Sequence, residues 1–300
     1  MLSLHSNVIV LLGKKGDRRI FRGRAAKNAS VPFFGILRLP GCASPMKGLW
    51  IVAVSAVLAW SQNSALVLLL IGKSYYMSGH FKKASESFQR AVEADPGNSA
   101  YHLWLGRAYG RRAETSNWFS APSLAKQAKS CFEKAVDLDP KNTEAINDLL
   151  EYYMQAPGFL GGGEDKARAL ADRLKQIDIA EYHAAQARLA EHRKEYGVAE
   201  LQFKRAIDLA PSKAGLIMDL ARLLSRLGRY KESDQYFHHA RSVAPDDPQV
   251  LFEQASAYVE ARRNLEQARD LLKKYLDSPL TPDHPSRAEA RKLLQQAGGG

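Results

Sequence analysis

Histidine is the residue type in this chain that could most readily ligate a metal ion or move a proton. His238 and His239 are adjacent, so on a helix their side chains would point about 100° apart and could not easily share one metal ion. We expect these two residues, together with His183 and His192, to be surface or packed histidines rather than ligands.

The cysteines and glycines complete the search for reactive groups. The chain has 2 cysteines, too few for a disulfide framework or a multi-cysteine metal site. We expect Cys131, which stands beside Phe132, to be a small buried apolar residue, while Cys42 belongs to the N-terminal leader. The run 161–163 is Gly-Gly-Gly followed by two acidic residues, which favours a turn and a helix N-cap over an anion site. Sequence patterns of P-loops, nucleophile elbows and helical zinc sites do not occur. We therefore predict no enzyme activity, no cofactor and no metal.

Positive charge is the feature that could attract a partner. The chain has 300 residues, 45% of them hydrophobic and 25% charged, with 43 basic and 32 acidic residues and a net charge of +11. Nine basic residues and one acidic residue lie in residues 1–47, and residues 48–61 are uncharged, which leaves +3 for residues 62–300. A strongly basic chain would indicate nucleic acid or an anionic membrane, but the nearly neutral remainder argues against nucleic acid.

The N-terminal residues predict targeting. Residues 46–61 comprise Met46-Lys47, an uncharged and mostly apolar run, and the small residues of a cleavage site at Ala59 and Ser61, which together are typical of a secretory signal peptide. Residues 1–45 then form a basic leader, disordered or added by an over-extended start site. The alternatives are an uncleaved anchor, since residues 48–72 are uncharged and long enough to span a bilayer, and an organelle transit peptide. We expect any membrane contact to be made through this N-terminal segment alone.

Four similar segments follow residue 64. Each carries a small residue, then Phe four residues later, then Ala after three more, then Pro after five more; the prolines are Pro96, Pro140, Pro211 and Pro245. The first three positions lie on one face of a helix, and the proline ends that helix. A second helix precedes each of the first two segments, with Gly72 and Tyr75 in one and Gly106 and Tyr109 in the other. We expect the glycine to let two helices approach closely and the tyrosine to fill the space above it.

This arrangement, with a period of 34 residues between Pro211 and Pro245, resembles the tetratricopeptide repeat, and in particular exported or membrane-associated bacterial proteins of that type. The repeats are expected at residues 65–98, 99–142, 143–179, 180–213, 214–247 and 248–280. The resemblance implies an all-α fold, a right-handed α-solenoid of about six helix pairs over residues 65–280, in which each repeat buries its apolar face against its neighbours. Residues 281–300 are predicted to form a capping helix and a flexible tail.

Two insertions interrupt the regular pattern. Ten additional residues lie between the paired helices of the second repeat, and five in the third. Insertions in solenoids map to loops on one edge, so Trp118, Phe119, Phe159 and Leu160 are predicted to lie on neighbouring loops. They either pack on each other and on helix ends or form a partner-binding patch.

The resemblance also implies that the first helix of each pair lines the concave groove. The ninth position of that helix is basic in four of the six repeats. With the thirteenth position, the candidate groove residues are Lys73, Arg107, Arg111, Arg188, Arg222 and Arg226. They either form a positive groove for acidic or carboxylate-ended peptides, or lie on a solvated face and pair with Glu144, Glu181 or Glu191 nearby.

The function that the sequence favours is a non-enzymatic scaffold that binds another protein or an acidic peptide. We expect it to be exported, periplasmic or secreted, after signal cleavage, or else membrane-anchored. A cytoplasmic or organellar adaptor or chaperone cofactor is the alternative, and a nucleic-acid-binding repeat protein is a weaker one.

Overall fold

The computed structural model describes residues 64–298, and all of the regular structure in this part of the chain is helical. Six helices form the first members of pairs, which we call A helices: residues 64–77, α3 (Ser99–Thr115), α5 (Thr143–Gln155), α7 (Ile179–His192), α9 (Ala214–Arg226) and α11 (Pro248–Glu260). Their partners, the B helices, are α2 (Phe81–Ala94), α4 (Ala121–Leu138), α6 (Glu164–Leu174), α8 (Tyr196–Leu209), α10 (Tyr230–Val243) and α12 (Leu265–Asp277). A short 3₁₀ turn, η2 (Gly158–Leu160), precedes α6, and α13 (Arg287–Gly298) follows the last pair.

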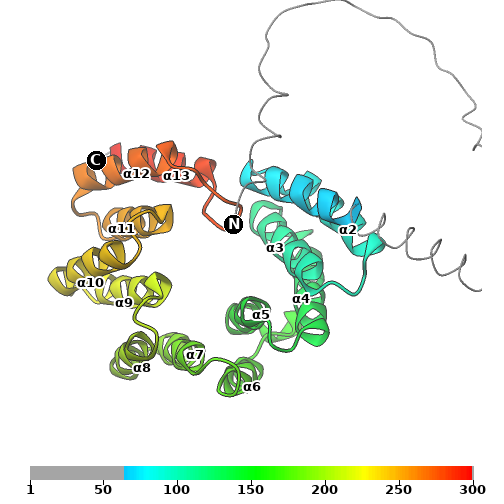
Figure 1. Cartoon of the computed structure of the whole chain (residues 1–300), viewed down its shortest axis with the longest axis horizontal. Helices are drawn as coiled ribbons and strands as arrows, with labels where there is room; N and C mark the ends of the chain where they lie inside the picture. Colours follow the sequence, from blue (N-terminus) through cyan, green and yellow to red (C-terminus); the bar gives the residue numbers. More distant parts are fainter. Residues whose placement is uncertain (1–63, 299–300) are drawn as a thin grey trace, which may run out of the picture. The chain divides into compact units, whose positions relative to one another are not determined.

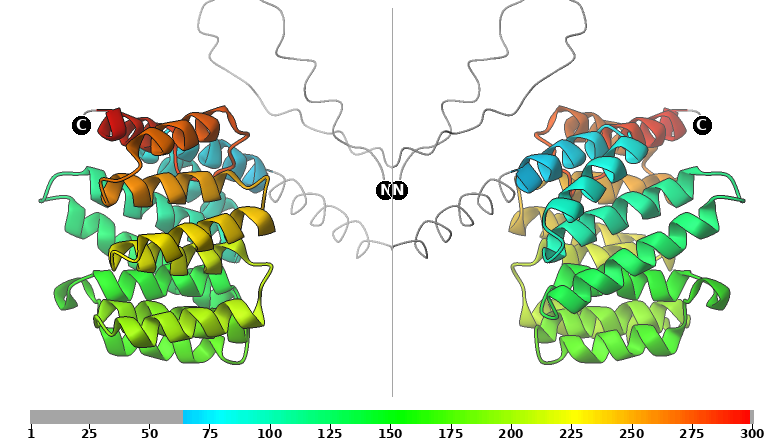
Figure 2. Two further views of the ribbon diagram at one scale, coloured as in Figure 1. Left: turned by 90° about the vertical axis from the view of Figure 1, so that its left-hand side faces the viewer. Right: turned by 90° about the vertical axis from the view of Figure 1, so that its right-hand side faces the viewer.

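The pairs follow one another around an open centre, with the A helices on the inside and the B helices on the outside (Figure 1). The predicted all-α repeat solenoid is thus confirmed. Helix α13 packs on α12, where Ala290 and Ala297 join the buried cluster around Leu272 and Tyr275. The turns within pairs gather on one edge of the solenoid and the connections between pairs on the opposite edge (Figure 2).

The prolines set the ends of the B helices. Helices α2, α4, α8 and α10 each end two residues before a proline, with the residue in between as the C-cap. A residue before proline is driven away from the helical region by the proline ring. For α4 that residue is Asp139, which has φ −134° and ψ 90°. The following A helix then begins at a polar cap in several repeats: the side chains of Asn98, Asn142, Asp178 and Asp247 accept from backbone N–H groups of the first turn.

The glycines of the first two repeats lie against aromatic rings. A Cβ atom at Gly72 would lie 2.4 Å from the ring of Phe88, and one at Gly106 would lie 2.6 Å from the ring of Phe132. The close helix approach is therefore present. The prediction that tyrosine fills this space was wrong, because the second-helix phenylalanine occupies it, and Tyr75 and Tyr109 pack beside the cluster.

The predicted leader, signal peptide and most of the alternative anchor lie outside the described residues. Within residues 64–298 no helix is both long enough and apolar enough to cross a membrane.

Candidate functional site

Three neighbouring hollows line the concave face of the solenoid. The first, of about 470 Å³, lies between α3, α11 and the segment before α13. The second, of about 510 Å³, is lined by α5, α7, α9 and α11, and the third, of about 490 Å³, by α5, α7, α8 and α9. The first two share Gln249, and the last two share Arg188, Asp219 and Arg222. Together they form the groove. Apart from Lys73, every predicted groove cation lines at least one of them.

A regular contact joins the A helices across this groove. The ninth-position cation of one repeat contacts the sixth-position side chain of the next repeat in four of the five junctions. One of these contacts is a cation–π contact, in which Lys73 Nζ lies 4.3 Å from the centroid of the Trp104 ring. The other three are ion pairs, with N–O distances of 2.6 Å for Arg107–Asp148, 3.0 Å for Arg188–Asp219 and 3.3 Å for Arg222–Glu253. The remaining junction has Glu151 at the ninth position and Ala185 at the following sixth position. We call this series the inter-repeat ladder.

Asp219 is the centre of the ladder. Its carboxylate accepts hydrogen bonds from both Arg188 and Arg222, and its side chain is 13% exposed. Burial by itself would raise the pKa of Asp219, but the two guanidinium groups outweigh burial and hold the pKa below its usual value. Both arginines stay charged, because the neighbouring carboxylates raise their pKa values despite burial. Arg188 and Arg222, two of the cations that the sequence singled out, thus have carboxylate partners within the protein.

Ion pairs of the same kind continue along the groove. Arg226 pairs with Glu191, and Arg111 pairs with Glu114 and Glu289. Carboxylates therefore accompany the cations along the hollows, and the groove has mixed charge rather than a positive stripe. Whether these arginines bind a partner stays a prediction.

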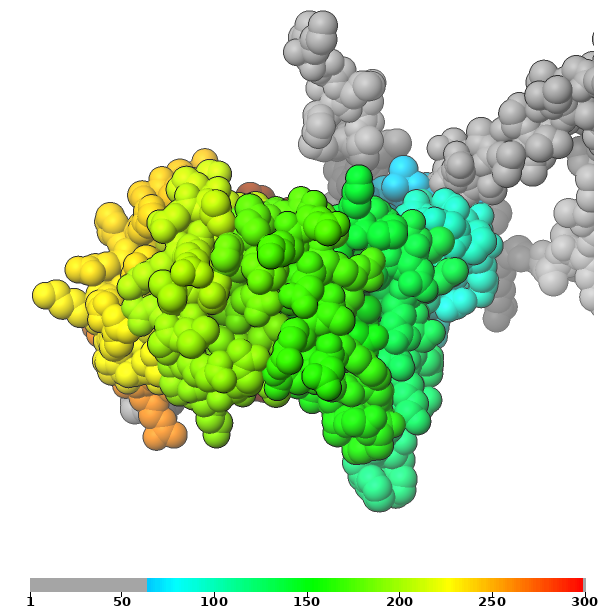
Figure 3. All heavy atoms as spheres, turned by 90° about the horizontal axis from the view of Figure 1, so that it is seen from below, coloured from blue at the N-terminus to red at the C-terminus, as the bar shows by residue number. Residues whose placement is uncertain are grey.

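The inserted loops form an edge with exposed aromatic side chains. Trp118 and Phe119 are 75% and 74% exposed and contact each other, with ring centroids 3.8 Å apart. Phe159, in η2, is 75% exposed, whereas Leu160 is half-buried and its carbonyl accepts from Tyr152. The two loops project from the same edge (Figure 2), and the projection is visible from below in Figure 3. Helix α4 contacts η2. We call these loops the aromatic edge; partner binding there is also still a prediction.

The glycine run in the third repeat shapes its loop. Gly161 and Gly163 have φ of 87° and 150°, and a Cβ atom at Gly162 would lie 1.7 Å from the carbonyl oxygen of Ala156. Side chains are excluded there by geometry. The run is thus the turn and N-cap predicted from the sequence, with Gly163 as the N-cap of α6.

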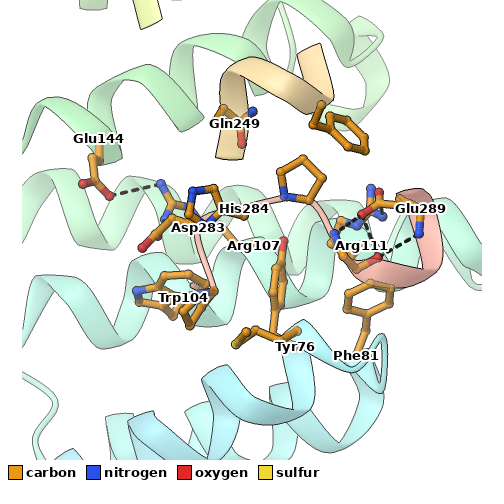
Figure 4. A pocket seen from close by; sticks show the side chains of 15 residues that line it. Tyr76, Phe81, Trp104, Arg107, Arg111, Glu144, Gln249, Asp283, His284 and Glu289 are labelled. Atoms are coloured by element: carbon orange, nitrogen blue, oxygen red, sulfur yellow. Dashed lines mark hydrogen bonds and ion pairs between the residues drawn. The ribbon is translucent and has the colours of Figure 1, made fainter. Parts of the chain in front are cut away.

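Around the first hollow, an aromatic shelf lies beneath two arginines. The Tyr76 ring contacts both Phe81 and Trp104 edge to face, with centroid distances of 5.3 Å for Tyr76–Phe81 and 5.5 Å for Tyr76–Trp104. The Arg107 and Arg111 guanidinium groups lie 5.0 Å and 5.1 Å from the rings of Trp104 and Phe81. Burial raises the pKa of Tyr76 to about 12, although both arginines oppose the shift. Figure 4 shows Asp283 and His284 entering the same hollow from the segment before α13.

Reactive groups do not gather in the described residues. Cys131 is half-buried and packs against the core cluster that includes Phe88 and Trp104. Burial raises the pKa of the Cys131 thiol to about 12, which keeps it protonated. No group of three His, Cys, Asp or Glu residues in the described range has the geometry to hold a metal ion.

The comparisons with known proteins agree with this architecture. Profiles described as Tetratricopeptide repeat match residues 65–98, 125–142 and 218–285. The chain contains tetratricopeptide repeats. A Xenopus laevis protein, Tetratricopeptide repeat protein 37, is 29% identical over 113 residues, which are 37% of this chain and only 6% of that protein. The structure of TTC0263, a TPR protein of Thermus thermophilus, has 21% identity and a TM-score of 0.50, and the match covers 65% of this chain and 99% of that one. PilF of Pseudomonas aeruginosa has 16% identity and a TM-score of 0.45, with 77% and 98% covered.

The inter-repeat ladder and the groove include residues that the sequence did not single out. The carboxylates Asp148, Asp219 and Glu253 recur at the sixth position of the first helix, and the same repeat alignment that located the cations could have located them. Glu289 was also missed. The sequence Ser286-Arg-Ala-Glu289 is a capping box, in which Glu289 accepts from the Ser286 N–H and the Ser286 hydroxyl accepts from the Glu289 N–H.

Proposed function

We propose that this protein is a non-enzymatic scaffold that binds an extended polypeptide in its concave groove. The observation that carries the proposal is the groove itself, three neighbouring hollows on the inner face of one rigid array. A preformed surface of this kind loses little conformational entropy on binding. The mixed charge of the lining suits a polar peptide that offers both backbone hydrogen-bonding groups and side-chain charges, and acidic side chains would be bound where arginines face the first hollow.

A bulky residue placed in the groove tests this proposal. Gly215 lines the second hollow, and a Cβ atom there would have no neighbour within 4 Å. Gly215→Trp should therefore fill the hollow without disturbing the core, and we expect it to abolish capture of the partner by affinity purification from the native host. Gly197→Trp is the matched control, because Gly197 lies on the B helix α8 and its Cβ position is equally free. The control should retain capture.

The exposed rings of the aromatic edge favour a second contact surface on the same scaffold. The triple variant Trp118→Ser, Phe119→Ser and Phe159→Ser removes them without touching the core. If capture survives Gly215→Trp and is lost in the triple variant, the aromatic edge binds the partner and the groove proposal is wrong.

We further propose that the scaffold is exported or membrane-tethered. The apolar and uncharged sequence of residues 48–61 supports this. The exposed apolar side chains of the first helix add support, since Leu66, Val67 and Leu70 are 49%, 54% and 58% exposed and continue that apolar stretch.

The mature N-terminus distinguishes these possibilities. We expect N-terminal sequencing of the protein recovered from each compartment of its host to find a terminus near Gln62 in an exported fraction. A terminus at Met46 in a membrane fraction would favour the anchor. Recovery of the intact chain from the soluble cytoplasmic fraction would contradict the proposal and favour a cytoplasmic adaptor.

A further inference from the structure

The segment between α12 and α13 lies against the opposite end of the array. Asp283 lies 3.6 Å from Arg107 of α3, and Glu289, in the first turn of α13, forms an ion pair with Arg111 of the same helix. These contacts join the residues after the sixth repeat to the second repeat. Arg111 and Glu289 are 178 residues apart in the sequence. In Figure 4 the segment occupies the space between α11 and α3.

The segment also forms contacts with α11 and α12, the helices that precede it in the chain. The Tyr275 hydroxyl donates to the carbonyl of Pro285, and His284 Nε2 lies 3.3 Å from Asp247, the N-cap of α11. His284 Nδ1 accepts from the Thr281 N–H at 2.9 Å, which fixes the turn that presents Asp283. The segment is thus anchored to α11 and α12, and it places Asp283, together with Glu289 of α13, against α3.

The α3 surface that receives these carboxylates has the features of a peptide site. Arg107 and Arg111 face the hollow above the aromatic shelf of Tyr76, Phe81 and Trp104. Guanidinium groups bind carboxylates through directed, charge-assisted hydrogen bonds, and aromatic faces accept proline rings and extended backbone. The segment offers the matching chemistry, because Asp283 stands between Pro282 and Pro285.

We propose that Arg107, Arg111 and the aromatic shelf form a subsite for an acidic, proline-containing segment of the partner polypeptide, and that the chain's own residues 278–289 occupy this subsite until the partner displaces them. This inference rests on the proposed function of the groove and names the chemistry of one part of it. An intramolecular segment acts at an effective concentration of about millimolar. A free peptide with the same contacts therefore competes poorly until the internal contacts weaken.

A peptide-binding experiment on the full chain tests the subsite. The probe is a fluorescently labelled peptide with the sequence of residues 278–290, and its binding is followed by fluorescence anisotropy. The variant Asp283→Asn with Glu289→Gln, which we call the released variant, removes the two charges that residues 278–289 place on α3. It leaves the pairs of Arg107 with Asp148 and Glu144 and of Arg111 with Glu114 in place, and glutamine at position 289 can still complete the capping box. We expect this variant to bind the peptide at least about tenfold more tightly than the unaltered protein. A peptide with Asn and Gln at the two acidic positions should bind neither protein.

The control variant makes the same change of charge elsewhere. Glu266→Gln with Asp270→Asn alters two exposed carboxylates of α12, and it should bind the peptide as weakly as the unaltered protein does. Adding Arg111→Gln to the released variant should abolish binding. Circular dichroism and thermal unfolding of each variant establish that it is folded.

Two results would overturn the inference. Equal affinity of the peptide for the unaltered protein and the released variant would show that the internal segment does not compete. No binding by the released variant, while Gly215→Trp still abolishes capture of the partner, would show that the groove binds its partner without this subsite. Retained capture in Gly215→Trp is instead the failure of the proposed function, so the two failures are distinguishable.

Discussion

Asp219→Ala should lower the free energy of unfolding by about 3 kcal/mol, because it leaves two half-buried guanidinium groups without their shared carboxylate. The value lies at the low end of the range for broken buried pairs, since the side chains of Arg188 and Arg222 are 26% and 39% exposed and water can partly replace the carboxylate. Urea-induced unfolding at pH 7, followed by circular dichroism, measures the change. Glu191→Ala is the matched control: it removes the partner of Arg226, which is 48% exposed, and should cost less than about 1 kcal/mol.

The pH dependence of the free energy of unfolding, compared between the unaltered protein and Asp219→Ala, is a second test. Because the pKa of Asp219 is lowered in the folded protein, its stabilising contribution is complete above the unfolded-state pKa of about 3.9 and is lost as the pH falls through the lower, folded-state pKa. Acidification from neutral pH to below that range should therefore destabilise the unaltered protein more than Asp219→Ala. Parallel losses in the two proteins would show that Asp219 is not held by its arginines.

Gly106→Ala should lower the free energy of unfolding by about 2 kcal/mol, through overpacking. The new methyl group would lie 2.6 Å from the ring of Phe132, so the ring or the helix must move. Gly110 lies on the same helix and its Cβ position has no neighbour within 4 Å. Gly110→Ala should therefore be neutral or stabilise the protein by up to about 1 kcal/mol, since alanine favours the helix over glycine.

A double-mutant cycle identifies the cause of the loss. In a Phe132→Leu background the ring is absent, and Gly106→Ala should cost less than it does in the unaltered protein. If the two substitutions are simply additive, contact with Phe132 is not the reason for the glycine.

The helical repeats could be predicted from the sequence because their determinants are local and recur. Proline fixes the end of a helix through its own ring, and the spacing of Ala84, Phe88 and Ala91 places all three on one buried face. Such patterns need no knowledge of the rest of the chain. The positions of the six groove cations followed from the same repeat alignment, and five of them line the hollows.

The electrostatic character of the groove could not be predicted in the same way, because it depends on pairs between repeats. Pairing with Glu144, Glu181 or Glu191 was one expectation for the groove cations, but the ion-pair partner of Arg188 is Asp219, which lies 31 residues later. The occupant of the first hollow depends on still more distant residues. The curvature of the whole array decides that Glu289 meets Arg111, and no local pattern encodes that curvature. The side chain of Tyr109 was placed wrongly because the spacing of residues along the chain does not show whether the Tyr109 ring or the Phe132 ring of the partner helix reaches Gly106.

The contact between α3 and the segment before α13 also bears on how the molecule opens. In a linear array each repeat contacts only its neighbours, so the terminal repeats fray first and do so independently. Here Asp283 and Glu289, which follow the last repeat, form ion pairs with α3 of the second repeat. Unfolding at one end of the array would therefore remove contacts from the other end. We therefore expect that opening the array at either end also requires the loss of this contact between its two ends.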